Sequence, residues 1–160
     1  MFAHVPSDQR LTIDATDDLI LQLLQQDGRM STADLARAVN MSASSTADRV
    51  RRLTDHGVIQ GYRAVINPAA LGYPLTAFIR VRLTTGVANP FRDLLQATPA
   101  ITEAHHLTGD DCYLLKVLAR SMADLEDLTG KLVTFGHLTT NIVFSSPVHG
   151  RTLPPADDHA

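Results

Sequence analysis

Three arginines within four residues form the densest positive cluster of the chain: Arg49, Arg51 and Arg52. Three serines come shortly before them: Ser42, Ser44 and Ser45. Hydroxyl groups near a helix start can bind phosphate, and a guanidinium can neutralise phosphate or bind guanine through two parallel hydrogen bonds. The segment from 42 to 52 therefore has the residue types that contact double-stranded DNA.

Other reactive side chains do not form a catalytic pattern. Cys112 is the only cysteine, which excludes an internal disulfide, and neighbouring Asp111 disfavours its thiolate. His105 and His106 are adjacent on a predicted strand, so their side chains point to opposite faces and make a poor metal pair. No segment resembles a nucleophile elbow. We predict no catalytic residue and no metal site, and a packing or pocket-lining role for Cys112.

Two predicted helices precede the serines. Asp14 caps the first and Gly28 stops it, and its apolar face consists of Ile20, Leu21, Leu23 and Leu24. The second helix begins at Ser31, with Asp34 at the spacing of a capping box. Residues 39–42 then form a tight turn.

A third helix positions the serines and arginines. Ser42 caps it and Gly57 ends it, and the alternation over 58–66 predicts a strand before Asn67-Pro68. Helix, short helix, tight turn, helix and strand is the outline of a winged helix-turn-helix. This order predicts that the third helix is the recognition helix, which enters the major groove of DNA.

One face of the third helix is expected to meet DNA. A buried stripe of Thr46, Val50 and Leu53 places an exposed set on the other side: Ser44, Asp48, Arg51, Arg52 and Asp55. Ser45 and Arg49 lie at its margins. Asp48 is repelled by phosphate, so it either pairs with Arg52 or accepts a hydrogen bond from a cytosine amine, and we favour the pair.

The second half of the chain has a different pattern of predicted elements, in which strands alternate with helices. Strands are predicted at 77–83, 101–107, 112–118 and 139–146, with helices opened by Asn89-Pro90 and by Ser121. The turn 108–111 joins the two middle strands as a hairpin. The order β-α-β-β-α-β is the split ferredoxin-like arrangement, so the fold class is α+β.

Length and composition fit two small domains. We predict a disordered tail at 1–12, a DNA-binding domain at 13–66, a linker at 67–74, a second domain at 75–147 and a disordered tail at 148–160. The formal net charge of −3 argues mildly against nucleic-acid binding, although it does not exclude a local basic patch. Without a secretory signal or a long apolar run, we expect a cytoplasmic protein that does not bind membranes.

Taken together, the motifs resemble the Lrp/AsnC (feast/famine) family of transcriptional regulators over about residues 13–146. The matching residues of the first half are Ile13-Asp14-x-x-Asp17-x-x-Ile20-Leu21-x-x-Leu24, Asp27-Gly28-Arg29, Leu35-Ala36, Met41-Ser42, Arg49-Val50-Arg51-Arg52-Leu53 and Gly57-Val58-Ile59-x-Gly61-Tyr62. Those of the second half are Asn67-Pro68, Leu71-Gly72, Thr108-Gly109-Asp110, Tyr113-Leu114-Leu115-Lys116 and Thr140-x-Ile142-Val143. No single piece is specific, but their order and spacing are.

This resemblance implies a winged helix-turn-helix followed by a ligand-sensing (RAM) domain. It implies dimers that assemble further into tetramers or octamers, no cofactor, and a small-molecule effector, an amino acid or a related metabolite, held between dimers by the middle turn and by the last strand of a neighbour. Carried over by position, the effector site is His106, Gly109, Asp110, Asp111, Cys112, Met122, Thr140, Asn141 and Ile142. Backbone N–H groups around Gly109 suit a carboxylate, and Asp110 or Asp111 suits an ammonium group.

The sequence departs from the family at two places. Asp111 replaces an aromatic residue and Cys112 replaces an acid, so the effector need not be an ordinary amino acid. Thr46 stands where an aliphatic residue is usual, which either weakens packing or lets its hydroxyl bond back to the backbone. Two other functions compete with a regulator: an oligomeric small-molecule-binding protein without DNA binding, and an enzyme on the ferredoxin-like domain.

Overall fold

The computed structural model of the protein describes residues 11–109 and 112–153. The chain divides into two compact units, residues 1–64 with 148–160 and residues 65–147. This division lies close to the predicted start of the linker at 67. None of the helices in the described ranges is long and apolar enough to cross a membrane.

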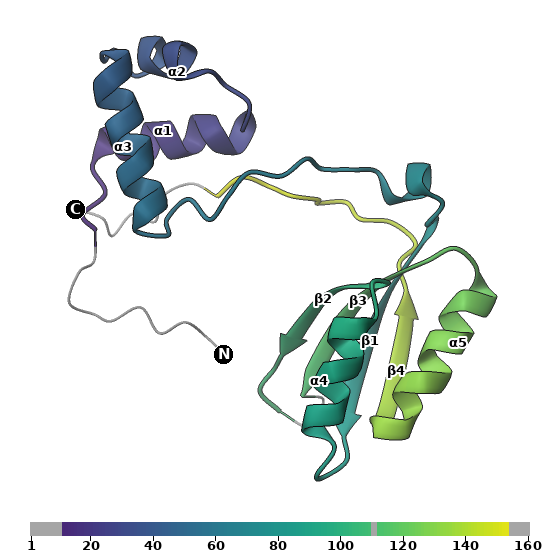
Figure 1. The fold of residues 1–160 in the computed structure, drawn as a ribbon. Helices are drawn as coiled ribbons and strands as arrows, with labels where there is room; N and C mark the ends of the chain where they lie inside the picture. The colour runs from purple at the N-terminus through teal and green to yellow at the C-terminus, as the bar shows by residue number, and fades with distance from the viewer. Residues whose placement is uncertain (1–10, 110–111, 154–160) are drawn as a thin grey trace. The chain divides into compact units, whose positions relative to one another are not determined.

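The first unit contains the three predicted helices (Figure 1): α1 (Ala15–Gln26), α2 (Thr32–Ala38) and α3 (Ala43–Asp55). Their apolar faces meet in a small core of Ile20, Leu35, Leu53 and Ile59. Ser31 and Ser42 cap α2 and α3 as predicted, each accepting a hydrogen bond from a backbone N–H at 3.1 Å. The turn between these helices places Asn40 in the left-handed region, at φ 54°. Asparagine tolerates that conformation better than most residues, so the sequence is suited to the turn.

The capping box of this unit lies at α1 rather than at Ser31. The Asp17 N–H donates to the Asp14 carboxylate at 2.8 Å, and the Asp14 N–H donates to the Asp17 carboxylate at 3.3 Å. At α2 the Asp34 carboxylate accepts a hydrogen bond from the Ser31 hydroxyl at 2.6 Å rather than from the Ser31 N–H, as a capping box would require. The carboxylates of Asp14 and Asp17 are therefore fixed beside each other at the start of α1.

The predicted strand over 58–66 is wrong within the described residues. The chain turns back after α3, where the N–H groups of Val58 and Ile59 both donate to the Leu53 carbonyl, and residues 60–66 then continue without helix or strand. An isolated extended segment has no ladder of hydrogen bonds to stabilise it, and no described strand lies beside this one.

The inner ends of both predicted tails, residues 11–12 and 148–153, belong to the part of the chain that the structure describes. Residues 1–10 and 154–160 lie outside the described residues. Leu11, placed in the disordered N-terminal tail, packs against the small core of the first unit. Residues 148–153 are described, and Leu153 makes two hydrogen bonds to Gln25 of α1.

The second unit is a four-stranded antiparallel sheet with helices on one face (Figure 1). Its strands are β1 (Leu75–Leu83), β2 (Ile101–His106), β3 (Tyr113–Ala119) and β4 (Gly136–Ile142), in the order β2-β3-β1-β4. The helices are α4 (Ala88–Ala97) and α5 (Met122–Leu132), with short 3₁₀ turns η1 (Pro68–Leu71) and η2 (Val133–Phe135). This is the predicted β-α-β-β-α-β fold. Its core includes Ile79, Val81, Phe91, Leu115, Val117 and Leu132.

Two boundaries in this unit differ from prediction. The N-cap residue of α4 is Val87, which makes no side-chain cap, so Asn89 lies inside the helix rather than capping it. β4 begins at Gly136 instead of 139, opposite Leu83, and ends at Ile142. A Cβ atom on Gly136 would lie 2.0 Å from the Arg82 carbonyl oxygen, so the two strands approach so closely there only because residue 136 is glycine.

Candidate DNA interface and effector site

Helix α3 presents the predicted DNA-contacting face. Thr46 and Leu53 are fully buried, as the stripe predicted, and the Thr46 hydroxyl donates to the Ser42 carbonyl at 3.0 Å. Ser42, Ser44 and Ser45 are exposed at the start of the helix, where the Ser42 hydroxyl lies 3.1 Å from that of Ser44 and 2.8 Å from that of Ser45. A helix start with clustered hydroxyls has the donors and the dipole that favour phosphate.

Two of the three arginines are committed to a carboxylate inside the unit. Asp17 is fully buried, and its oxygens accept from Arg49 at 2.8 Å and from Arg52 at 2.5 Å. Arg49 also donates to Asp14 at 2.7 Å. These contacts hold α3 against the start of α1, so Arg49 and Arg52 orient the recognition helix and are less available to DNA than the sequence suggested.

The ionic contacts also shift two pKa values. The Asp17 N–H and the Arg49 guanidinium lower the pKa of Asp14, and the hydrogen bonds to Asp14 and Asp17 raise the pKa of Arg49. Both groups are therefore charged at neutral pH. Sequence reasoning did not find this cluster, although Asp17 lies three residues before Ile20 on the buried face of α1. A carboxylate on a buried face signals that a cation must pair with it.

The predicted pair between Asp48 and Arg52 is wrong. Asp48 instead accepts from Arg51 at 2.6 Å, because the buried Asp17 holds Arg52 on the other side of the helix. The Arg51 side chain is 69% exposed and that of Asp48 is 65% exposed. An exposed ion pair is weak, so DNA phosphate can compete for Arg51. Of the three predicted arginines, Arg51 thus has the most exposed side chain.

One part of the predicted effector site lies at the β2–β3 hairpin. His106 ends β2 and stacks on Tyr113, with ring centroids 4.8 Å apart. Gly109 has a φ of 100°, which suits glycine in a tight turn. Cys112 is half-buried against the core, with its Sγ 3.7 Å from the Val81 carbonyl oxygen. Asp110 and Asp111 lie outside the described residues.

The other part lies at the opposite edge and end of the sheet. Thr140, Asn141 and Ile142 are exposed at the end of β4, and Met122, at the start of α5, is 56% exposed. Ile142 pairs with Ala77, whereas the hairpin meets β1 at Val81. Strand geometry therefore separates the two parts by roughly 13 Å along the strands and 14 Å across the sheet. A single copy does not bring them together.

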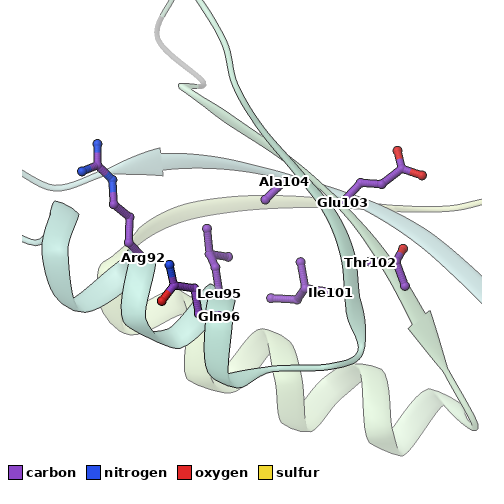
Figure 2. A pocket seen from close by; sticks show the side chains of 7 residues that line it. All are labelled: Arg92, Leu95, Gln96, Ile101, Thr102, Glu103 and Ala104. Carbon is purple, nitrogen blue, oxygen red and sulfur yellow. The ribbon is translucent and has the colours of Figure 1, made fainter. Parts of the chain in front are cut away.

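A shallow cavity of about 300 Å³ lies between α4 and the edge strand β2 (Figure 2). Leu95 and Ile101 form its apolar floor, Arg92 lies at its mouth, and the Glu103 carboxylate points away from it. Glu103 instead binds Lys116 at 2.8 Å, which with nearby His105 lowers the pKa of Glu103. None of the predicted effector residues that the structure describes lines this cavity. Among the described residues, no group of three or more metal-ligating side chains is present.

A three-helix DNA-binding unit joined to a ferredoxin-like unit defines a class of two-domain transcriptional regulators, and comparisons with known proteins agree. Residues 13–60 match the winged helix-turn-helix DNA-binding family, and residues 76–153 match the Lrp/AsnC ligand binding domain. The chain therefore belongs to the Lrp/AsnC family of DNA-binding transcriptional regulators.

Individual relatives support this assignment. The leucine-responsive regulatory protein of Haemophilus influenzae is 39% identical over 121 residues, which cover 74% of this chain and 73% of the relative. The regulator FL11 of Pyrococcus horikoshii is 30% identical over 148 residues, 91% of this chain and 98% of the relative. Among solved structures, the complex of NMB0573 from Neisseria meningitidis with L-Met has a TM-score of 0.83 at 27% identity, covering 92% of this chain and 99% of that one.

Proposed function

We propose that the protein binds operator DNA through α3 and that an amino acid or a related metabolite modulates this binding. The observation that carries the DNA-binding half is the exposed face of α3, with three clustered serines at its start and Arg51 further along. Ser42, Ser44 and Ser45 contact the phosphate backbone, and Asp48 sets how Arg51 is presented. Because operators lie in the cytoplasm of a bacterium or an archaeon, we expect the protein to act there, without a bound cofactor.

The salt dependence of DNA binding tests this role. Replacing Arg51 with alanine is expected to lower affinity and to reduce the slope of log K against log salt by about 0.9 for each phosphate that is no longer neutralised. Filter binding or fluorescence anisotropy over a salt series measures both quantities. Arg120→Ala is the matched control, because Arg120 is 70% exposed and pairs with Asp124 as Arg51 pairs with Asp48, but lies in the second unit. An Arg51→Ala slope equal to that of the control contradicts the assignment.

The proposed assembly joins copies through the second unit. Its helices cover one face of the sheet, and the other face carries half-buried apolar side chains: Phe78, Leu114 and Leu118. Lys116 and Glu103 form an ion pair on this same face. A second copy supplies a matching apolar face, and pairing around a two-fold axis places two α3 helices for successive half-sites on DNA. Sedimentation equilibrium of the purified chain measures the stoichiometry.

The effector site requires more than one copy. The hairpin residues and the β4 residues lie far apart in one chain, so an effector that contacts both sets binds where the hairpin of one copy meets β4 of another. Backbone N–H groups near Gly109 bind the carboxylate of an amino acid, and Asp110 or Asp111 binds its ammonium group. His106, Met122 and Ile142 contact its side chain. Two relatives have been solved with L-methionine, NMB0573 and Rv3291c, which supports an amino acid as the class of effector.

A thermal-shift screen tests this half of the proposal. Among the twenty amino acids and related metabolites, at least one is expected to raise the melting temperature, because a ligand that binds the native state stabilises it by mass action. The double variant Asp110→Ala/Asp111→Ala is expected to abolish that shift, because the ammonium group of the effector then has no counter-charge. Asp127→Ala, an exposed acid on α5, serves as the control. A full shift with the double variant contradicts the ammonium assignment.

A further inference from the structure

The chain passes between its two units twice. It first crosses after residue 64, and it crosses again after residue 147, since the compact units are residues 1–64 with 148–160 and residues 65–147. The second crossing follows β4 directly. The Val143 N–H donates to the Thr76 carbonyl at 2.9 Å beside the end of β4, and residues 143–153 have no helix or strand (Figure 1).

The C-terminal segment is attached to α1 by a pair of hydrogen bonds. The Gln25 side-chain amide donates to the Leu153 carbonyl at 3.1 Å, and the Leu153 N–H donates to the Gln25 side-chain oxygen at 2.9 Å. The Gln25 side chain thus binds both the N–H and the carbonyl of Leu153, as the backbone of a neighbouring β-strand would. Gln22 and Gln26 of α1 line a small cavity of about 160 Å³ with Thr152 and Leu153.

The attachment is suited to exchange between two states. Leu153 is 75% exposed, so little apolar surface holds it, and solvent-exposed hydrogen bonds contribute small net free energies. A docked segment and a released segment therefore interconvert readily, and a modest bias shifts their populations.

Each end of this connection meets a site that the proposed function uses. At one end, Thr140, Asn141 and Ile142 of the candidate effector site immediately precede the segment. At the other end, α1 carries Gln25 and also Asp17, which binds Arg49 and Arg52 of the recognition helix. One segment and one helix therefore connect the end of β4 to α3.

We propose that residues 143–153 couple the ligand-binding unit to the DNA-binding unit, with Gln25 as the attachment point of the segment. This inference rests on the proposed function. Effector bound beside β4 changes the relative populations of the docked and the released segment. The docked segment in turn changes the orientation of α1, together with α3, which is bound to it. Coupling between two sites requires an element with two states whose equilibrium both sites shift. The segment, either docked on α1 or released from it, is that element.

The test compares Gln25→Ala with Gln60→Ala, the matched control, because Gln60 is an exposed glutamine of the same unit that does not line this cavity. L-methionine is the probe, and the DNA dissociation constant is measured with and without it. Allosteric coupling typically changes affinity by roughly 5- to 150-fold. We expect L-methionine to change the DNA dissociation constant in the wild type and in Gln60→Ala. In Gln25→Ala the change is expected to be less than about twofold, although L-methionine still binds. A change in Gln25→Ala as large as that in the wild type overturns the proposal.

Hydrogen exchange separates failure of this inference from failure of the proposed function. Coupling is reciprocal, so DNA binding is expected to change the exchange rate of the Val143 amide in the wild type and not in Gln25→Ala. The same Val143 response in both proteins, or in neither, overturns the inference without any effector. Absence of DNA binding by the wild type contradicts the DNA-binding half of the proposed function instead, and the absence of any shift in the thermal-shift screen contradicts its effector half.

Discussion

Asp17→Asn is expected to destabilise the DNA-binding unit by about 2–4 kcal/mol. The fully buried Asp17 carboxylate accepts from Arg49 and Arg52, and asparagine keeps its shape but removes its charge. Arg52 would then lose its carboxylate and Arg49 would keep only Asp14, and the amide nitrogen would add a donor where both neighbours are donors. Leaving buried polar groups uncompensated costs several kcal/mol, and partial exposure of both arginines keeps the loss below the upper end of that range.

Hydrogen exchange measures this loss in the affected unit. Amides of α1 and α3 report its opening free energy, and amides of β1 and β3 serve as an internal reference in the other unit. Asp18→Asn, one residue further along the same helix turn, is the control and is expected to change stability by less than about 0.5 kcal/mol. Equal exchange rates in the Asp17 and Asp18 variants would show that the buried ion cluster is not needed for stability.

Gly136→Ala is expected to destabilise the ligand-binding unit by about 2–3 kcal/mol. The added methyl group would lie 2.0 Å from the Arg82 carbonyl oxygen and 3.0 Å from the Leu83 Cα atom. Both contacts are with backbone, so no side-chain rotation relieves them and the start of β4 must move away from β1. Thermal unfolding measures the loss of stability, and hydrogen exchange of the β1 and β4 amides shows whether the loss lies in the ligand-binding unit.

Gly130→Ala provides a control of opposite sign. Gly130 lies inside α5, where an added Cβ meets nothing within 4 Å. Alanine is favoured over glycine in a helix interior by roughly 0.8–1.0 kcal/mol, so this variant should be more stable than the wild type. If Gly136→Ala also proved as stable as the wild type, the close approach of β4 to β1 would be wrong.

Local patterns predicted most of the elements correctly. The stripe through Thr46 and Leu53 set the phase of α3, because both residues lie on the same helix and their spacing alone decides which face is buried. The strand predicted at 77–83 is likewise confirmed as β1, and Ile79 and Val81, two residues apart on one face of it, are buried in the core. The serine caps of α2, α3 and α5 were also readable, since each hydrogen bond joins residues three apart.

Long-range contacts account for the errors. The partner of Arg52 is Asp17, 35 residues earlier, so helix spacing suggested Asp48 instead. The start of β4 depends on the pairing of Gly136 with Leu83, which no local pattern encodes. The alternation over 58–66 was real, but alternation does not supply a neighbouring strand. Gln25 and Leu153, 128 residues apart, gave no sequence signal at all.

The effector site was a prediction from the family resemblance alone, and the structure adds a geometric condition to it. The hairpin with His106 and the end of β4 with Ile142 occupy opposite edges of one sheet. Residue types at the hairpin suggest how a zwitterion would be bound, but one copy does not bring both sets together. In the site that we propose, that part of the chemistry is a property of the quaternary structure, which a single sequence does not display.

The use of Arg49 and Arg52 inside the fold has a consequence for how the protein occupies an operator. In the proposed interface, each α3 offers DNA one well-exposed guanidinium, already partnered by Asp48, so we expect the intrinsic affinity of one unit to be low. Linking several such units raises the effective concentration of the later ones once the first has bound, and the gain grows with every additional half-site. Occupancy should then be steep in protein concentration and sensitive to half-site spacing. Target choice would depend on avidity, so an isolated half-site elsewhere in a genome would stay largely empty.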